Sequence, residues 1–398
     1  MNIVFFTHPS FLGHQSMPRY ANWLSKGMEE RGHHVELWSP KAFLSALPVK
    51  SSSLKKWLGY IDQYVIFPMQ VKARLKKIPR DTLFVFTDHA LGPWVPLVKD
   101  RLHIVHCHDF LAQRSALGEI PENVTGLTGK IYQSYIRKGY CCGRNFISIS
   151  IKTRTDLHRM LPKSPLISEV VYNGLTRRFS PADNIYQMRA DLSKETGIDL
   201  HAGFILHVGG NLWYKNKAGI IAAYDEWRQG SGQQLPLILI GESPDDRLQA
   251  LINRSNYVTD IHPLAGMPDG FTNKAYSAAS LFLFPSLAEG FGWPIVEAMA
   301  SGCPVITTDA APMNEVGGAA AFYVSKMQIG MESQWRKECA SLIDRVLRLN
   351  EADHQEIASR GLENVNRFSS PTALNNVEKV YRQVESGISF LTESELQK

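Results

Sequence analysis

The chain has 398 residues, of which 44% are apolar and 20% charged, a balance typical of a globular protein with two or three domains. It has no run of 18 apolar residues and opens directly into an apolar segment, so we expect neither a membrane-spanning helix nor a signal peptide. The net charge of +5 divides into +13 for residues 1–178 (25 Lys and Arg against 12 Asp and Glu) and −8 for residues 179–398 (18 against 26). The basic first half therefore predicts contact with an anionic partner.

The first half begins with the pattern of a Rossmann-like sheet. A strand at residues 3–7, an amphipathic helix at 20–30 and a strand at 35–38 form a βαβ unit. Four later apolar runs have the length of buried strands. They cover residues 83–86, 104–107, 146–150 and 168–172.

The second half repeats this pattern after a polar linker at residues 177–184. We expect strands at residues 204–208, 237–240, 281–284 and 305–307, with helical stretches between them. A helical stretch at 372–385 has no strand after it. The sequence therefore predicts an α/β protein made of two doubly wound parallel sheets, whose ligands bind at the carboxyl ends of the strands.

The most informative stretch runs from residue 284 to residue 305 (FPSLAEGFGWPIVEAMASGCPV). A buried strand leads into a glycine-rich loop, and a helix then begins with Pro294 in its first turn and ends at Gly302. Glu289 and Glu297 flank this crossover, and a carboxylate can accept hydrogen bonds from both hydroxyls of a vicinal diol. The N–H groups of residues 290–292 lie at the positive end of the helix. This arrangement favours a polyhydroxylated, anionic ligand such as a sugar nucleotide.

A second loop, GGNLWYKN at residues 209–216, follows the strand at 204–208. Its glycines allow the backbone to approach a ligand closely, and Lys215 supplies a mobile positive charge for a diphosphate. An ordinary turn between strand and helix, with a solvated lysine, is the alternative.

Together these loops resemble the retaining glycosyltransferases with the GT-B fold, family 4 type. The pattern FPS-x-x-EGFG-x-P-x-x-EAMA-x-G-x-PV contains their E-x7-E signature, and the resemblance is strong after residue 172 and weak from 40 to 80. It implies two Rossmann-like, doubly wound parallel-sheet domains facing a cleft. We expect an acceptor-side domain at 1–178, a nucleotide-sugar donor domain at 179–371, and a C-terminal helix at 372–398 that crosses back to the first domain.

The resemblance also assigns roles to single residues. Glu289 would hold sugar hydroxyls near the reacting carbon, Glu297 would hold the ribose diol, and Lys215 would stabilise the diphosphate. An arginine that the family often carries after its glycine is absent, and Asn211 or Leu212 stands in its place. The remaining donor-binding residues would be Gly13, Gly210, Asn211, Gly290, Phe291 and Gly292.

The first half supplies fewer matches. Gly13 corresponds to one glycine of the family's first loop, while His14 departs from the other. His108 matches a histidine that the family places near the reacting sugar, and it is our second catalytic candidate beside Glu289. Weaker candidates are Asp88-His89, Ser150 to Arg154, and Glu315.

We expect no metal site. His106 and His108 lie on one face of a strand but have no evident third ligand, and His106 also fits a core position. The five cysteines, without a CxxC spacing, argue against a zinc site or a disulfide framework and favour a reducing compartment. No DxD motif lies in a suitable loop.

Residues 51–80 mix seven Lys and Arg with large apolar side chains and contain one acid, Asp62. This composition fits an interfacial surface at an anionic membrane, and two core-packed helices with solvated lysines are the alternative.

From these features we expect a cytoplasmic, metal-independent and retaining hexosyltransferase without a cofactor, associated peripherally with the inner face of the membrane. It would transfer a hexose from a nucleoside diphosphate sugar to a glycan or a lipid-linked sugar in polysaccharide or glycolipid assembly, and we expect no nucleic-acid partner. The alternatives are a GT-B sugar-nucleotide epimerase and a non-catalytic GT-B partner subunit.

Overall fold

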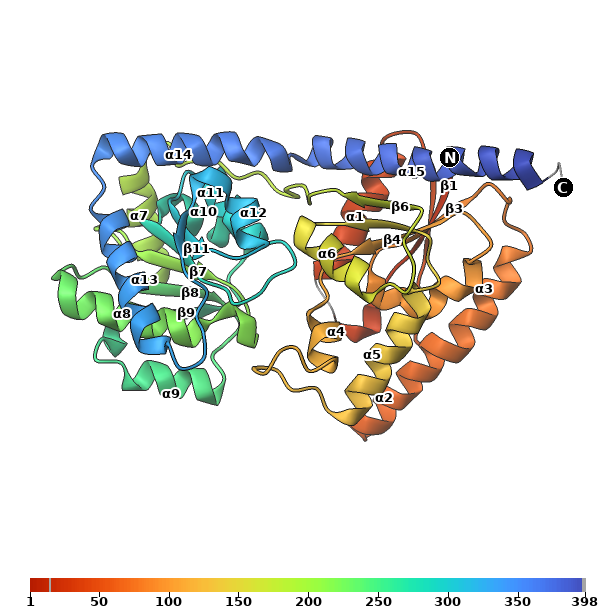
Figure 1. The fold of residues 1–398 in the computed structure, drawn as a ribbon. Helices are drawn as coiled ribbons and strands as arrows, with labels where there is room; N and C mark the ends of the chain where they lie inside the picture. Colours follow the sequence, from red (N-terminus) through yellow and green to blue (C-terminus); the bar gives the residue numbers. More distant parts are fainter. Residues whose placement is uncertain (14–15, 396–398) are drawn as a thin grey trace. The chain divides into compact units, whose positions relative to one another are not determined.

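The computed structural model describes residues 1–13 and 16–395, with side chains up to residue 387 (Figure 1). The chain forms two compact units. Unit 1 comprises Met1–Gly174 and Ser370–Lys398, and unit 2 comprises Leu175–Ser369. The sequence placed the corresponding boundaries at residues 178 and 371.

Unit 1 is built on a six-stranded sheet in the order β2-β1-β3-β4-β5-β6. All neighbouring strands are parallel. β1, β3, β4 and β5 consist almost entirely of buried residues, as expected where helices cover both faces of a parallel sheet. The strands are β1 (Asn2–Phe6), β2 (His34–Trp38), β3 (Leu83–Phe86), β4 (His103–Cys107), β5 (Asn145–Ser148) and β6 (Ile167–Val170).

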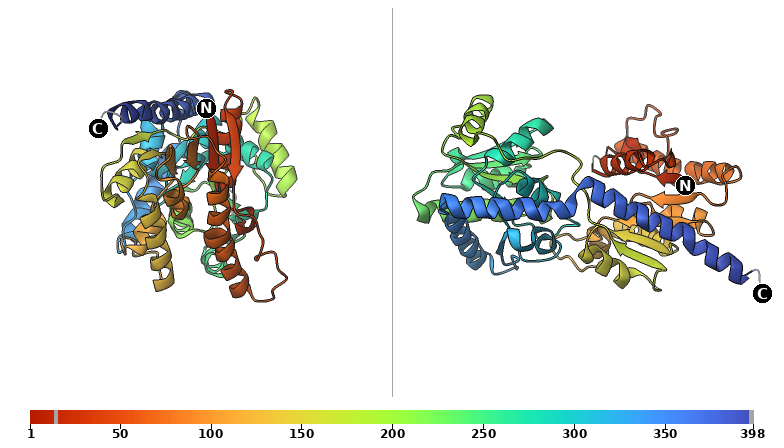
Figure 2. Two further views of the ribbon diagram at one scale, coloured as in Figure 1. Left: turned by 90° about the vertical axis from the view of Figure 1, so that its right-hand side faces the viewer. Right: turned by 90° about the horizontal axis from the view of Figure 1, so that it is seen from above.

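The helices of unit 1 include a long segment in which α2 (Ser52–Ile61), the π-helical turn η2 (Asp62–Ile66) and α3 (Phe67–Leu75) follow each other without a break. Ser51 caps its start by accepting a hydrogen bond from the N–H of Leu54. Figures 1 and 2 show this segment as one rod. The other helices are α1 (Ser16–Glu29), η3 (His89–Val98), α4 (Leu111–Ala116), α5 (Leu127–Tyr140) and α6 (Ile151–Met160).

The C-terminal helix α15 (Ser370–Glu395) is part of unit 1. Its Tyr381 is fully buried, and the hydroxyl lies 2.8 Å from Nε2 of His106. At its start, the indole N–H of Trp23 donates to the hydroxyl of Ser370 at 2.6 Å. The helix is therefore anchored to both α1 and β4.

Unit 2 repeats the architecture with a parallel sheet in the order β12-β11-β10-β7-β8-β9. The prediction missed its two edge strands, β9 and β12. β9 contains Pro263 and is only half-buried, while β12 has three residues, so neither shows the continuous apolar run of a central strand. The strands are β7 (Ile205–Val208), β8 (Leu237–Gly241), β9 (Ile261–Ala265), β10 (Leu281–Phe284), β11 (Val305–Thr308) and β12 (Phe322–Val324).

The core of unit 2 lies between this sheet and its helices, with Trp227 and Trp335 among its largest side chains. The helices are α7 (Ile185–Thr196), α8 (Lys217–Ser231), α9 (Asp246–Arg254), α10 (Asp269–Ala278), α11 (Trp293–Ala300), α12 (Met313–Gly317), α13 (Glu332–Leu347) and α14 (Glu351–Val365). Within the part of the chain that the structure describes, no helix has the length and apolar character needed to cross a bilayer.

Candidate functional site

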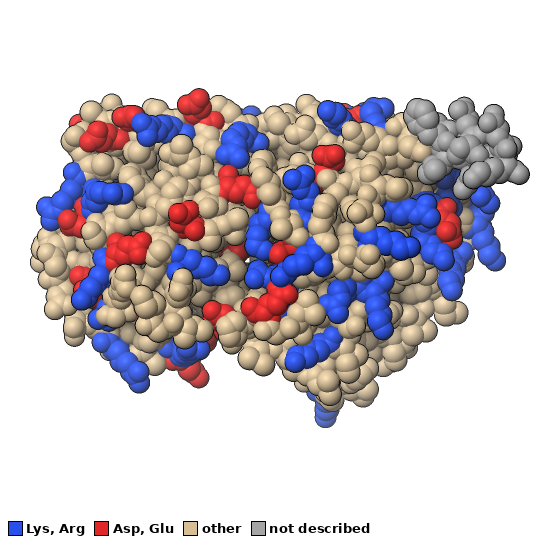
Figure 3. Space-filling model, in the orientation of Figure 1, with Lys and Arg blue, Asp and Glu red and all other residues tan. Residues whose placement is uncertain are grey.

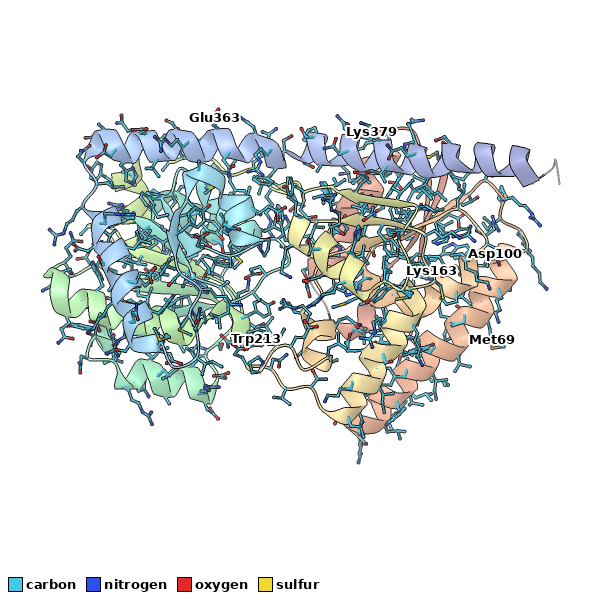
Figure 4. All side chains as sticks on the ribbon, viewed as in Figure 1. Met69, Asp100, Lys163, Trp213, Glu363 and Lys379 are labelled. Atoms are coloured by element: carbon cyan, nitrogen blue, oxygen red, sulfur yellow. The ribbon has the colours of Figure 1, made fainter. Side chains whose placement is uncertain are left out.

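The two loops singled out in the sequence meet in unit 2. β7 and β10 are neighbours in the sheet, so their carboxyl ends lie at the same edge. The side-chain amide of Asn216 donates to the carbonyl of Pro285 at 3.1 Å, and the N–H of Leu287 donates to the carbonyl of Tyr214 at 2.7 Å. These hydrogen bonds fasten the loop after β7 to the loop after β10. Figure 4 labels Trp213, which lies in the first of them.

An ion pair also joins these two loops. Nζ of Lys215 lies 2.7 Å from Oε1 of Glu289, and the two side chains are only 12% and 9% exposed. The same ammonium lies 4.8 Å from the centroid of the Phe284 ring. The sequence assigned Lys215 to a diphosphate and Glu289 to sugar hydroxyls as separate roles. The structure joins them, so each fixes the position of the other.

The loop after β7 needs its glycines because its backbone passes close to a carboxylate, a contact that the sequence did not reveal. A Cβ at Gly210 would lie 3.2 Å from the carboxylate of Glu242, which follows β8. The other oxygen of this carboxylate accepts from the N–H of Asn211 at 3.1 Å. Glu242 therefore holds the loop in place, and a side chain at residue 210 would push it away.

A second ammonium group lies beside this loop. Nζ of Lys217 donates to Oδ1 of Asn211 at 2.8 Å, and its side chain is largely buried. Burial lowers the pKa of Lys217, and the positive charge of Lys215 acts in the same direction. Asn216, whose φ of 56° is left-handed, forms the turn between the two lysines. Asn211, in the position of the missing arginine, is thus held by a cation.

His207 lies beneath the same loop. Its Nδ1 lies 3.0 Å from the carbonyl of Leu283 and must carry the proton, because a carbonyl can only accept. Nε2 is buried without a hydrogen-bond partner among the described residues and would lie 3.1 Å from a Cβ at Gly209. Burial lowers the pKa of His207 to about 3, and Lys217 and Lys215 lower it as well. The ring is therefore neutral.

Glu297 lies on α11 and contacts a tyrosine that sequence reasoning missed. The hydroxyl of Tyr276, on α10, donates to Oε2 of Glu297 at 3.0 Å. Burial and then the charge of Glu297 raise the pKa of Tyr276 well above its usual value, so the tyrosine stays protonated and keeps donating. The two residues are 21 positions apart, and no local pattern connects them.

In the loop before α11, the candidate binding groups are backbone N–H groups rather than side chains. Gly292 adopts a φ of 106°, a conformation that favours glycine, immediately before the first residue of the helix. Phe291 is buried, with its ring 5.5 Å from that of Phe368. That the N–H groups of Gly290, Phe291 and Gly292 face a ligand stays a prediction.

Unit 1 gathers polar side chains at the carboxyl ends of β1, β3 and β4. Asp88 is buried, with Oδ2 at 2.9 Å from Nε2 of His8 and Oδ1 at 2.9 Å from Nδ1 of His89. Burial alone would raise the pKa of Asp88, but the two histidines hold it well below its usual value. Asp88 in turn raises the pKa of the buried His89 against the effect of burial. The candidate pair Asp88-His89 thus forms a cluster with His8.

His108 directly follows β4 and lies near this cluster. Its Nε2 donates to the carbonyl of Thr87 at 2.9 Å, and its ring lies edge-on against Tyr20 at 4.4 Å. Burial lowers the pKa of His108, so the ring is neutral at physiological pH. His106 is a core residue whose two nitrogens contact the hydroxyls of Tyr20 and Tyr381, both at 2.8 Å. A sugar contact for His108 stays a prediction.

The weaker candidates have local structural roles. Gly13 has a left-handed φ of 69° and closes the turn at Ser10–Leu12, while His14 lies outside the described residues. The hydroxyl of Ser150 caps α6 by accepting from the N–H of Thr153, and the carbonyl of Glu315 accepts from Arg367. Within the described ranges, no group of three or more His, Cys, Asp or Glu side chains is placed to hold a metal ion.

Residues 188–355, all within unit 2, match the protein-family model described as Glycosyl transferases group 1. The chain is 31% identical over 183 residues to the O-antigen chain mannosyltransferase B of Escherichia coli, which covers 45% of this chain and 46% of that protein. It thus matches about half the length of this relative. It is 22% identical over 288 residues to the lipopolysaccharide glucosyltransferase WaaG of Escherichia coli K12, covering 70% and 72% of the two chains.

Solved structures resemble the whole chain. WaaG gives a TM-score of 0.68 at 14% identity, covering 95% of this chain and 99% of that one. HepE of Anabaena, solved in complex with UDP and glucose, gives 0.68 at 16% identity over 96% and 100% of the chains. At these identities the likeness establishes the fold. It is a GT-B fold with two Rossmann-like units, as the sequence predicted.

Proposed function

We propose that the chain is a retaining glycosyltransferase that moves a hexose from a nucleoside diphosphate sugar to an acceptor hydroxyl. The observation that carries this proposal is the pair Lys215–Glu289 at the edge of unit 2, 2.7 Å apart and inside the segment that matches the glycosyltransferase model. Relatives named as an O-antigen mannosyltransferase and a lipopolysaccharide glucosyltransferase support a role in polysaccharide or glycolipid assembly.

Unit 2 would hold the donor. Lys215 and Lys217 place two ammonium groups near the carboxyl end of β7, and this pair of charges suits a diphosphate. Glu297 would accept hydrogen bonds from the ribose diol while Tyr276 orients its carboxylate. HepE, which has the same fold, was solved with UDP and glucose, and this supports a nucleotide ligand. Gly210, Asn211 and the backbone of residues 290–292 would complete the donor site.

The proposed reaction uses the leaving group as the base. The bond between the anomeric carbon and the diphosphate oxygen breaks, the acceptor oxygen bonds to the same face of that carbon, and the acceptor proton passes to the diphosphate. Lys215 and Lys217 stabilise the negative charge that develops on the leaving oxygen. Glu289, fixed by Lys215, holds hydroxyls of the sugar. Two ammonium groups supply the charge that a divalent ion would otherwise provide, so we propose a metal-independent transfer.

Unit 1 would bind the acceptor and contribute His108, and its Gly13 would contribute to donor binding. A glycan or a lipid-linked sugar fits the named relatives, and we propose that the protein acts in the cytoplasm at the inner face of the membrane.

The test is a screen of nucleotide sugars by thermal shift, followed by a transfer assay with the donor that stabilises the protein. We expect release of nucleoside diphosphate only when an acceptor is present, and a product with the anomeric configuration of the donor. Conversion of the donor without an acceptor would instead indicate an epimerase. Donor binding without turnover on any acceptor would indicate a non-catalytic partner subunit.

A further inference from the structure

Unit 1 carries two stripes of exposed apolar side chains that its own core does not use. Along α2, η2 and α3 they recur every three or four residues, and on α5 every four. The residues, which we call the paired-helix face, are Leu54, Trp57, Ile61, Val65 and Met69 on the first segment and Leu127, Ile131 and Tyr135 on α5. Their exposed fractions range from 38% at Ile61 to 75% at Leu127. Figure 4 shows the labelled Met69 pointing away from unit 1.

The two helical segments meet through tyrosines, which bring the two stripes next to each other. The hydroxyls of Tyr64 and Tyr132 lie 2.7 Å apart. The rings of Tyr60 and Tyr132 lie 5.8 Å apart, and those of Tyr64 and Tyr135 lie 5.5 Å apart. Single exposed apolar residues are ordinary, but eight on two adjoining helices form a patch of the kind that binds a partner or a membrane.

The charges around this patch have one sign. Residues 51–80 hold seven Lys and Arg and residues 127–140 hold three more. The only acid in either range is Asp62. Asp62 is buried, where its carboxylate accepts from the N–H groups of Leu44 and Ser45. In Figure 3 the part of unit 1 where Figure 1 draws α2 and α5 shows blue and tan atoms without red.

We propose that the paired-helix face docks on the surface of an anionic lipid bilayer. A second copy of the chain would bring ten like charges against ten others, so the charge pattern disfavours a symmetric dimer. Trp57 and Tyr135 are of the residue types that lie at the boundary between headgroups and acyl chains, and the exposed Lys72 and Lys76 continue the stripe beyond Met69. The apolar side chains would enter the bilayer surface while the lysines contact acidic headgroups.

Docking would also bring a pocket close to the lipid. The inner sides of the same helices contribute Tyr60, Tyr64 and Tyr132 to a pocket of about 310 Å³, together with His8 and Leu12 of the first loop. Under the proposed function this pocket would receive part of an acceptor that is itself attached to lipid. Only this link rests on the proposed function, because the surface and its charges are independent of any transfer reaction.

The test is co-sedimentation of the full chain with vesicles, without donor or acceptor. We expect binding to phosphatidylcholine vesicles that contain phosphatidylglycerol, little binding to phosphatidylcholine alone, and release by high salt. Lys72→Ser with Lys76→Ser should weaken partitioning about 25-fold, since each lysine near an anionic surface contributes roughly fivefold. Trp57→Ser with Ile131→Ser should also weaken it. The control is Lys163→Ser with Leu166→Ser, which removes an exposed base and an exposed apolar residue outside the face.

Quenching of Trp57 by lipids with brominated acyl chains tests the orientation, with Trp57→Phe as the reference. Quenching that disappears in this variant supports the proposal. No binding at low salt, equal loss in the control, or unquenched Trp57 on bound vesicles would overturn it. So would a concentration-dependent dimer that Trp57→Ser with Ile131→Ser abolishes, because the face would then be covered by a second copy. If the protein does not dock on membranes, the proposed transfer activity can still be measured with a soluble acceptor and should be unaffected.

Discussion

The ammonium of Lys215 lies 2.7 Å from the carboxylate of Glu289, and both side chains are almost fully withdrawn from water. The two residues come from loops that follow neighbouring strands, β7 and β10. A lysine that is already paired with a carboxylate is held in one place before any ligand arrives. The pair therefore links the position of the proposed sugar-binding group to that of the proposed phosphate-binding group.

Breaking this pair should cost stability as well as activity. Lys215→Ala leaves Glu289 largely buried and uncompensated, so we expect unit 2 to lose about 3 kcal/mol of unfolding free energy. Lys215→Ala with Glu289→Ala should cost less than the sum of the two single changes. Chemical denaturation of the four proteins measures both effects. Additive losses would show that the side chains do not interact.

Glu297→Ala should weaken binding of the free nucleoside diphosphate by about 1.5–3 kcal/mol, because a ribose diol would lose a charged acceptor. Tyr276→Phe should have a smaller effect, since it removes only the group that orients the carboxylate. Calorimetry of both variants checks this, with Glu356→Ala on the exposed side of α14 as the matched control. Unchanged affinity in Glu297→Ala would remove the residue from the nucleotide site.

Two buried histidines should make the fold sensitive to acid. Burial lowers the pKa of both His106 and His207 to about 3, far below the ordinary value of 6.5. As the pH falls from about 6.5 towards 3, the unfolded chain takes up protons that the folded chain refuses. Each histidine should then remove about 1.4 kcal/mol of stability per pH unit, with no effect above about pH 6.5.

NMR titration of labelled histidine checks this directly. Both rings should remain neutral at about pH 5 in the folded protein. Protonation of His207 near pH 6.5 in the folded protein would mean that its nitrogen is accessible to water.

Excess EDTA should leave transfer intact, because Lys215 and Lys217 supply positive charge at the proposed diphosphate site. Lys217→Met, which keeps the length of the side chain, should lower affinity for the diphosphate. Loss of activity in EDTA that manganese or magnesium restores would show that a metal ion takes part.

The sequence predicted the central strands of both sheets because a strand buried on both faces is a continuous apolar run, as in Leu281–Phe284. It missed β9, where His262 and Pro263 interrupt the run at the edge of the sheet. It singled out Glu289, Glu297 and Lys215 as candidates because glycines and a helix start mark their loops. It could not find Tyr276, Glu242 or His207, whose roles depend on contacts between separate elements.

The measurement that bears most directly on the account is acceptor-dependent release of nucleoside diphosphate by the wild type, Glu289→Ala and Lys215→Ala, using the donor that the thermal-shift screen identifies. We predict turnover in the wild type with retention at the anomeric carbon, and a loss of at least about a hundredfold in each variant. Wild-type turnover in Glu289→Ala would contradict the assignment of the pair as the centre of the site.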